Sequence, residues 1–115
     1  MIGIYSITNL INGKRYIGKS INLNDRLSSH KCQLRKDVRK KDTNRYLFNA
    51  VKKYGMENFN FEVIECILDL DQEYLADREI YWMDYYKSYE RDFGYNLIKE
   101  SVYGKRDSVW IKSRL

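Results

Sequence analysis

The first 20 residues, MIGIYSITNLINGKRYIGKS, carry the pattern that decides the fold. Residues 3–8 alternate in polarity and are rich in β-formers, which predicts a strand. Asn12-Gly13 follows, and this dipeptide predicts a tight type I′ turn, because both central positions of that turn need a positive φ. Residues 15–18 then form the expected return strand. We therefore expect the chain to begin with a β-hairpin.

Helix signals come next. Asn22 is a good N-cap for a helix that runs to about Arg35, with Leu23, Leu27 and Leu34 spaced as one helical face. A charged loop is expected over residues 36–43, because no periodicity is present there.

The second half repeats the alternation of helix and strand signals. Asn44 predicts the N-cap of a helix that ends at Tyr54, with Gly55 in the left-handed C′ position. Further elements are expected as a strand at Phe59, Phe61 and Val63, a helix from Asp69 or Asp71 to about Tyr86, and a short strand or turn at 93–97. This order predicts a small antiparallel sheet covered by helices, an α+β architecture.

Length and composition bound the function. A chain of 115 residues fits one domain with a tail, which we place at residues 1–100 and 101–115, the latter a tail or the start of a linker. No apolar run approaches the roughly 18 residues of a membrane span, and no signal peptide is visible, so no membrane partner is expected. Cys32 and Cys66 lack metal-site spacing and fit a reducing cytoplasm.

Charge is unevenly distributed along the chain. Residues 31–53 carry nine basic and two acidic residues, net +7, whereas residues 54–100 carry four basic and twelve acidic residues, net −8. The basic block is either a solvated helix face or a footprint for a polyanion bound to one face. The residues that we assign to DNA contacts are Lys31, Arg35, Lys36, Arg39, Lys40, Lys41 and Arg45.

One motif points elsewhere. Residues 13–20 fit the phosphate-binding pattern G-x-x-x-x-G-K-[ST]. Its four middle residues are bulky, and the hairpin signal makes them a strand instead of a glycine-rich loop. The expected helix also begins only near Asn22, so a nucleotide-binding P-loop is the weakest interpretation.

Five residues suggest chemistry. Arg26 and His30 are one helical turn apart, which places a planar cation and a titratable imidazole side by side. Glu79 lies on an apolar helical stripe, where an ionised carboxylate needs a partner. That partner is either a cation in a salt bridge, from Arg78 or from a Lys elsewhere, or a metal ion. Tyr5 and Tyr16 can share one face of the hairpin, as sheet-packing aromatics or as part of a polar pocket.

Together these residues resemble the GIY-YIG nucleases. Gly3-Ile4-Tyr5 and Tyr16-Ile17-Gly18 match the two halves of that family's signature, with ten residues between the tyrosines. In register with them are Arg26 and His30, residues 44–55 as the family's second helix, Glu79 in its metal-binding segment, and Gly94-Tyr95-Asn96 as its closing motif. The resemblance covers about residues 1–100 and is closest to the catalytic domains of phage and intron-encoded homing endonucleases.

The resemblance implies a central three-stranded antiparallel sheet and a Mg²⁺-dependent (or Mn²⁺-dependent) endonuclease that hydrolyses double-stranded DNA. It implies that Glu79 holds the cation, that Arg26 stabilises the charge of the pentavalent phosphate, and that His30 assists proton transfer. The remaining implied roles are orientation or deprotonation of the attacking water by Tyr5 and Tyr16, and bracing of the site by Asn96.

The sequence departs from the family pattern in two ways, which limits how far the family's residue roles apply to it. Some homing-type members carry another His just before the second helix, where this chain reads Lys40-Lys41-Asp42-Thr43. Homing enzymes also continue into a DNA-targeting domain, and we expect weak sequence preference without one. The alternative is a catalytically silent DNA-binding or partner-binding module on the same fold.

Overall fold

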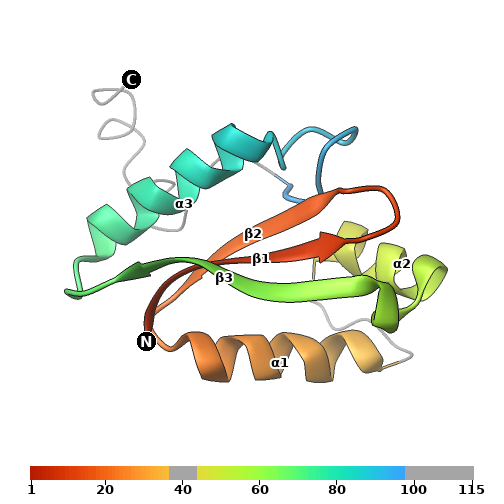
Figure 1. Cartoon of the computed structure of the whole chain (residues 1–115), viewed down its shortest axis with the longest axis horizontal. Helices are drawn as coiled ribbons and strands as arrows, with labels where there is room; N and C mark the ends of the chain where they lie inside the picture. The colour runs from red at the N-terminus through yellow and green to blue at the C-terminus, as the bar shows by residue number, and fades with distance from the viewer. Residues whose placement is uncertain (37–43, 98–115) are drawn as a thin grey trace.

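The computed structural model describes residues 1–36 and 44–97. A three-stranded antiparallel sheet, in the order β2-β1-β3, forms its centre (Figure 1). The elements are β1 Ile2–Asn9, β2 Arg15–Ser20, α1 Leu23–Arg35, α2 Arg45–Tyr54, the 3₁₀ turn η1 Met56–Asn58, β3 Phe59–Ile67 and α3 Gln72–Tyr86. The predicted sheet and helices are therefore confirmed. The expected loop at 37–43 and the proposed boundary at residue 100 lie outside the described residues.

The connection between β1 and β2 differs from the predicted type I′ turn. Gly13 has a positive φ of 78°, but Asn12 does not. The loop is longer, and the backbone N–H of Gly13 donates to the carbonyl of Asn9. Side-chain oxygens shape the turn instead, since Asn9 accepts from the N–H of Ile11 and Asn12 accepts from that of Lys14. Local Asx turns thus override the preference of the Asn-Gly dipeptide.

Strand β3 changes face part of the way along. Its pairing with β1 shifts register between Ile4 and Tyr5, which oppose Glu65 and Val63 respectively. The extra residue, Ile64, makes a β-bulge. The predicted alternation at Phe59, Phe61 and Val63 lies before this bulge, and the same alternation does not continue past it.

The helices begin at the predicted caps. Asn22, Asn44 and Asp71 each accept a hydrogen bond from a backbone N–H in the first turn of α1, α2 and α3. Gly55 has the positive φ expected after α2, at 92°, but its ψ of 138° lies outside the left-handed helical region, so that detail of the prediction is wrong. The extended ψ leads the chain directly into η1 and β3.

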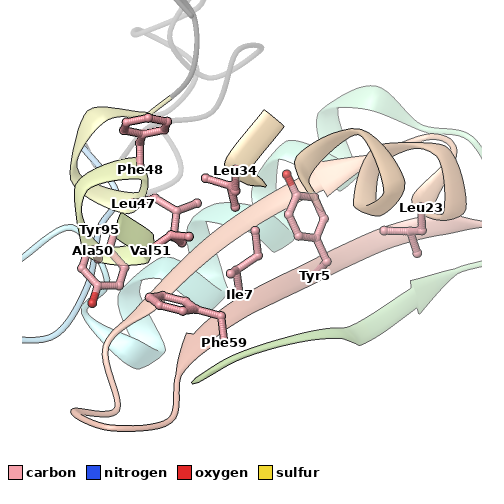
Figure 2. Packing of buried hydrophobic residues seen from close by; sticks show 10 residues of the cluster. All are labelled: Tyr5, Ile7, Leu23, Leu34, Leu47, Phe48, Ala50, Val51, Phe59 and Tyr95. Atoms are coloured by element: carbon pink, nitrogen blue, oxygen red, sulfur yellow. The ribbon is translucent and has the colours of Figure 1, made fainter. Parts of the chain in front are cut away.

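The sheet has an apolar core on each face. Tyr5, Ile7 and Phe59 pack against Leu23 and Leu34 of α1 and against the buried face of α2, as Figure 2 shows. On the opposite face, buried residues of the sheet and of α3 form a second cluster, whose fully or nearly fully buried members are Ile4, Ile17, Leu75 and Met83. Helices α1 and α3 thus sandwich the sheet (Figure 1).

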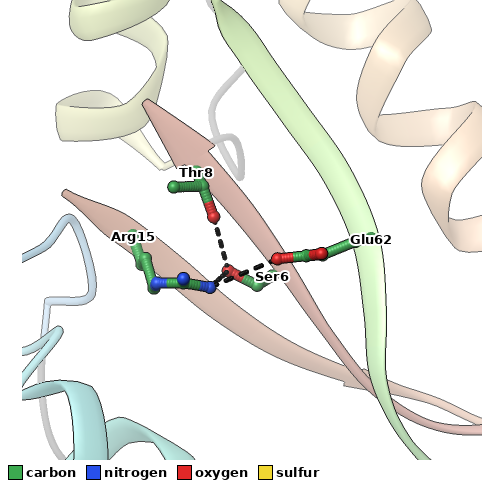
Figure 3. Close-up of polar contacts among 4 residues, drawn as sticks. All are labelled: Ser6, Thr8, Arg15 and Glu62. Atoms are coloured by element: carbon green, nitrogen blue, oxygen red, sulfur yellow. Dashed lines mark hydrogen bonds and ion pairs between the residues drawn. The ribbon is translucent and has the colours of Figure 1, made fainter. Parts of the chain in front are cut away.

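The α3 face of the sheet also holds a polar cluster beyond the apolar core. Ser6 bonds Thr8 at 3.0 Å, and the Arg15 guanidinium reaches both Ser6 and the carboxylate of Glu62, at 3.2 and 3.4 Å (Figure 3). The same guanidinium stacks 4.1 Å from the ring centre of Tyr86. Arg15 therefore ties the two outer strands to the end of α3. No helix in the described part of the chain is long and apolar enough to cross a membrane.

Candidate active site

The centre of the site is the hydroxyl of Tyr5, a side chain that is only 1% exposed. Nε2 of His30 lies 2.7 Å from this oxygen, and Nε of Arg26 donates to it at 3.4 Å. Tyr5 comes from the central strand and the other two from α1, which packs on that face of the sheet. The one-turn spacing of Arg26 and His30 thus brings both onto one oxygen.

The protonation states of this trio follow from burial. Desolvation raises the pKa of Tyr5 well above its usual range, so the phenol keeps its proton at neutral pH. Burial, and then the charge of Arg26, lower the pKa of His30 to about 4, so its imidazole is neutral. Tyr5 therefore accepts from Arg26 and donates to an unprotonated Nε2 of His30, which assigns the imidazole proton to Nδ1.

Tyr16 lies beside this trio on the same face of the hairpin, as predicted. Its ring centre is 6.4 Å from that of Tyr5 and 5.6 Å from the imidazole of His30. Burial, followed by the negative charge of Glu79, raises the pKa of Tyr16. An unassisted Tyr16 is therefore a proton donor at neutral pH and no base.

Glu79 reaches the same place from α3, although that helix covers the other face of the sheet. Strand β2 is an edge strand, so side chains from both faces can meet beyond it. Glu79 is only 9% exposed, and a pocket of about 410 Å³ opens between it, Tyr5, Tyr16 and Arg26. Arg78, a candidate partner for Glu79, instead pairs with Glu65 at 2.8 Å.

Gly18 makes this arrangement possible. It pairs with Tyr5 across the β1–β2 ladder, on the strand that borders the pocket. A Cβ on Gly18 would lie 2.2 Å from the hydroxyl oxygen of Tyr5, closer than atoms can approach. Only glycine at this position lets the phenol extend over β2 to meet Arg26 and His30.

Asn96 closes the outer edge of β2. Its side-chain oxygen accepts from the N–H of Ile17, and its side-chain nitrogen donates to the carbonyl of Ile17, both at 2.9 Å. The preceding residues add backbone bonds, since the N–H of Tyr95 donates to the carbonyl of Arg15. The predicted strand or turn at 93–97 is therefore an irregular segment with a single bridge, between Arg15 and Gly94. It holds β2, and with it Tyr16, in position.

Glu79 fits the divalent cation that the family resemblance implies. Mg²⁺ prefers oxygen ligands and is commonly held by one or two carboxylates, with water and substrate phosphate completing the shell. Among residues 1–36 and 44–97, no group of three or more His, Cys, Asp or Glu side chains is placed to hold a metal by itself. A cation on Glu79 would therefore take its remaining ligands from water and from a bound phosphate in the 410 Å³ pocket.

The predicted DNA-contact residues that the structure describes come from two helices. Lys31 and Arg35 project from the exposed side of α1, Lys36 caps the end of that helix, and Arg45 begins α2. Arg39, Lys40 and Lys41 lie outside the described residues. Arg45 donates to the hydroxyl of Tyr46 at 3.3 Å, and this bond lowers the pKa of that phenol.

Several pocket residues were absent from the predicted site. Lys19, Asn44 and Met83 line the pocket with the predicted residues. Asn44 was recognised only as a helix cap, but its side-chain nitrogen also donates to the carbonyl of Tyr95, next to Asn96. The strand conformation of residues 15–20 also contradicts a P-loop, because a strand leaves no backbone loop around a phosphate.

Comparisons with known proteins agree with this geometry. A family model described as the GIY-YIG catalytic domain matches residues 1–96. The segE protein of Enterobacteria phage T4, named as a proposed endonuclease, is 34% identical over 88 residues, which span 74% of this chain and 36% of the phage protein. The matched part is thus about a third of that relative's length.

Two solved structures share the fold. The catalytic domain of the homing endonuclease I-TevI superimposes with a TM-score of 0.73 at 26% identity, covering 85% of this chain and 99% of that domain. A mutant of the catalytic domain of the same intron endonuclease gives a TM-score of 0.73 at 25% identity, covering 87% and 96%.

Proposed function

Because the chain belongs to the GIY-YIG family and is a nuclease domain of the homing-endonuclease type, we propose that it hydrolyses phosphodiester bonds of double-stranded DNA. The proposal includes dependence on one divalent cation, Mg²⁺ or Mn²⁺, held by Glu79. The observation that supports it best is the convergence of Arg26 and His30 on the hydroxyl of Tyr5, next to the carboxylate of Glu79.

Arg26 is the residue that stabilises developing negative charge. Phosphodiester hydrolysis adds charge to the non-bridging oxygens of the phosphate, and preorganised donors at that point account for a large part of enzymatic rate enhancement. A guanidinium supplies planar N–H donors and stays charged at any working pH. The contact of Arg26 with the Tyr5 hydroxyl places that guanidinium at the pocket wall.

Tyr5 and His30 carry the proton. Because Tyr5 keeps its own proton at neutral pH, it can take one from the attacking water only while it passes its own to Nε2 of His30, 2.7 Å away. The neutral imidazole accepts that proton. A bound phosphate offsets the charge of Arg26, the second cause of the low pKa of His30, and so makes the imidazole a better base in the complex.

The remaining residues hold the reactants in place. Tyr16 orients the water from the same face of the sheet, and Asn96 is a positioning residue that keeps β2 in register. When bound at Glu79, the cation supplies Lewis-acid stabilisation of the phosphate oxygens and lowers the pKa of a bound water.

DNA binding completes the proposal. Lys31, Arg35, Lys36 and Arg45 are exposed, and with Arg39, Lys40 and Lys41 they supply contacts to phosphates that carry little sequence information. A separate C-terminal DNA-targeting domain would then provide the sequence preference. We place the activity in the cytoplasm of the host cell, where such a nuclease meets its DNA.

The test is cleavage of supercoiled plasmid by the wild type and by Glu79→Gln, which keeps the shape of the side chain and removes its charge. We expect nicking or linearisation with Mg²⁺, none with EDTA, and a loss of at least about 100-fold in Glu79→Gln. Glu73→Gln, on the exposed first turn of α3, is the matched control and should cut normally.

Two results would contradict the proposal. Cutting by Glu79→Gln at the wild-type rate would remove the carboxylate from the site. A folded wild type that binds DNA but leaves it intact with Mg²⁺ and Mn²⁺, alone and when fused to a DNA-binding domain, would favour the silent binding module.

A further inference from the structure

A second hollow lies on the other side of α1 from the active site. It has a volume of about 500 Å³ and opens between α1, η1 and the start of β3. Its walls are formed by Lys31 and Arg35 of α1, and by Met56, Glu57, Phe59, Asn60 and Phe61. We call it the α1–β3 groove. Within residues 1–36 and 44–97, it shares no lining residue with the active-site pocket.

The geometry of α1 separates the two hollows. At 100° per residue, His30 lies about 40° around the helix from Arg26, whereas Lys31 and Arg35 lie about 140° and 180° from it. Arg26 and His30 therefore face the β2 side of the sheet, and Lys31 and Arg35 face the β3 side. The two outer strands are about 10 Å apart, with β1 between them.

The groove combines cations with an aromatic floor. Nζ of Lys31 lies 5.3 Å from the ring centre of Phe61, within cation–π range. Arg35 is one helical turn further along the same wall. Glu57 is the only acidic residue among the described residues of the lining. Its carboxylate is turned back against Gly55, 2.5 Å from the position of a Cβ on that glycine.

We infer that the α1–β3 groove binds one unpaired nucleotide of a nucleic-acid strand. Lys31, turned away from the Phe61 ring, and Arg35 contact its phosphates. The flat face of its base then packs on Phe61 and Met56. A base in a duplex is stacked between its neighbours and cannot enter, so the ligand is single-stranded. An acidic peptide would satisfy the two cations but leave the aromatic floor uncovered, which is why we favour the nucleotide.

This inference refines the DNA-binding part of the proposed function and does not depend on hydrolysis. A nuclease domain that grips an unpaired nucleotide on one flank of α1 would prefer DNA that is frayed, nicked or locally melted next to the bond that it cuts. The binding experiment can therefore be done without metal, so that failure to bind and failure to cut are separate results.

Three methionines make the two hollows distinguishable by NMR. Met56 lines the groove, Met83 lines the active-site pocket, and Met1 is the first residue of the chain. With ¹³C-methyl methionine, assigned by Met56→Leu, each gives one methyl signal. We expect a single-stranded dT tetramer in EDTA to shift the Met56 signal saturably, and an abasic tetramer to bind at least about fivefold more weakly.

Charge variants supply the second arm. Lys31→Gln with Arg35→Gln should weaken the Met56 response at least about fivefold, because two phosphate contacts are lost. Lys52→Gln with Lys53→Gln removes the same charge from the exposed last turn of α2 and should leave the response unchanged.

Three outcomes would overturn the inference. A shift of the Met83 methyl signal with no shift of the Met56 signal would place the nucleotide in the active site. Equal binding of the abasic tetramer would mean that no base is held. If polyglutamate shifted the Met56 methyl signal with the same affinity as the dT tetramer, the groove would be a site for acidic protein.

Discussion

The two flanks of α1 carry similar side chains but have different surroundings. On the β2 side, Arg26 and His30 converge on a buried phenol, and the pKa values of His30 and Tyr5 move far from their usual values. On the β3 side, Lys31 and Arg35 stand exposed over an open groove. We therefore propose catalysis for the basic residues whose partner is buried, and nucleotide binding for those that stand over the open groove.

Gly18 offers the sharpest way to break this comparison, because it touches the β2 flank alone. In Gly18→Ala the new methyl group must displace the Tyr5 hydroxyl, since the two would lie 2.2 Å apart. A displacement of about 1 Å at a reacting group costs roughly 100-fold in rate, so plasmid cleavage should fall by about that factor. Nucleotide binding in the α1–β3 groove should stay at the wild-type level.

Gly13→Ala is the control for this variant. Gly13 has φ +78° in the hairpin loop, and a Cβ there would meet no atom within 4 Å. The substitution should cost about 1 kcal/mol of stability through backbone strain and leave cutting unchanged. Normal cutting by Gly18→Ala would show that the position of Tyr5 does not matter.

Lowering the pH should have a smaller effect, which arises from His30 on the β2 flank of α1. His30 has a pKa of about 4 in the folded protein against an ordinary 6.5. As the pH falls from about 6.5 to about 4, the unfolded chain takes up a proton that the folded protein does not. The free energy of unfolding therefore falls over this range, and the shift is worth up to about 3 kcal/mol.

The measurement is urea unfolding at a series of pH values for the wild type and His30→Gln. The difference between the two curves should fall by that amount between pH 6.5 and 4 and stay level below pH 4. A difference that does not change with pH would mean that the imidazole is solvated and does not bond to Tyr5 as described.

The sequence predicted what depends on neighbours along the chain. Asn22, Asn44 and Asp71 cap their helices because a cap bonds to a backbone N–H within the same turn. The strands followed from short alternating segments. The order of the elements was enough to predict a small antiparallel sheet covered by helices, and the family resemblance implied its three strands.

Features that depend on particular side-chain or strand contacts were missed or wrong. The type I′ turn failed because the side-chain oxygens of Asn9 and Asn12 bond to the loop backbone. The bulge at Ile64 is defined by the pairing of β3 with β1, which is distant in the sequence. The steric role of Gly18 appears only when Tyr5 is placed across the ladder.

The residues of the candidate site were predicted, but the hydrogen bonds that join them were not. Family resemblance indicated Tyr5, Tyr16, Arg26, His30, Glu79 and Asn96. All but His30 line one pocket, and His30 bonds to the hydroxyl of Tyr5. Asn96 also clamps the backbone of β2. The sequence alone could not show that one hydroxyl joins Arg26 to His30, because that requires both α1 and β1 in three dimensions.

The central claim is that the Tyr5 hydroxyl joins Arg26 and His30 into one catalytic unit, and Tyr5→Phe tests it most directly. The variant keeps the buried ring and removes only the oxygen. The measurement is the initial rate of supercoiled-plasmid cleavage with Mg²⁺, with Tyr85→Phe on the exposed face of α3 as the matched control. We predict a loss of at least about 100-fold for Tyr5→Phe, with plasmid binding and fold retained. A rate within threefold of the wild type, with the control unaffected, would contradict the account.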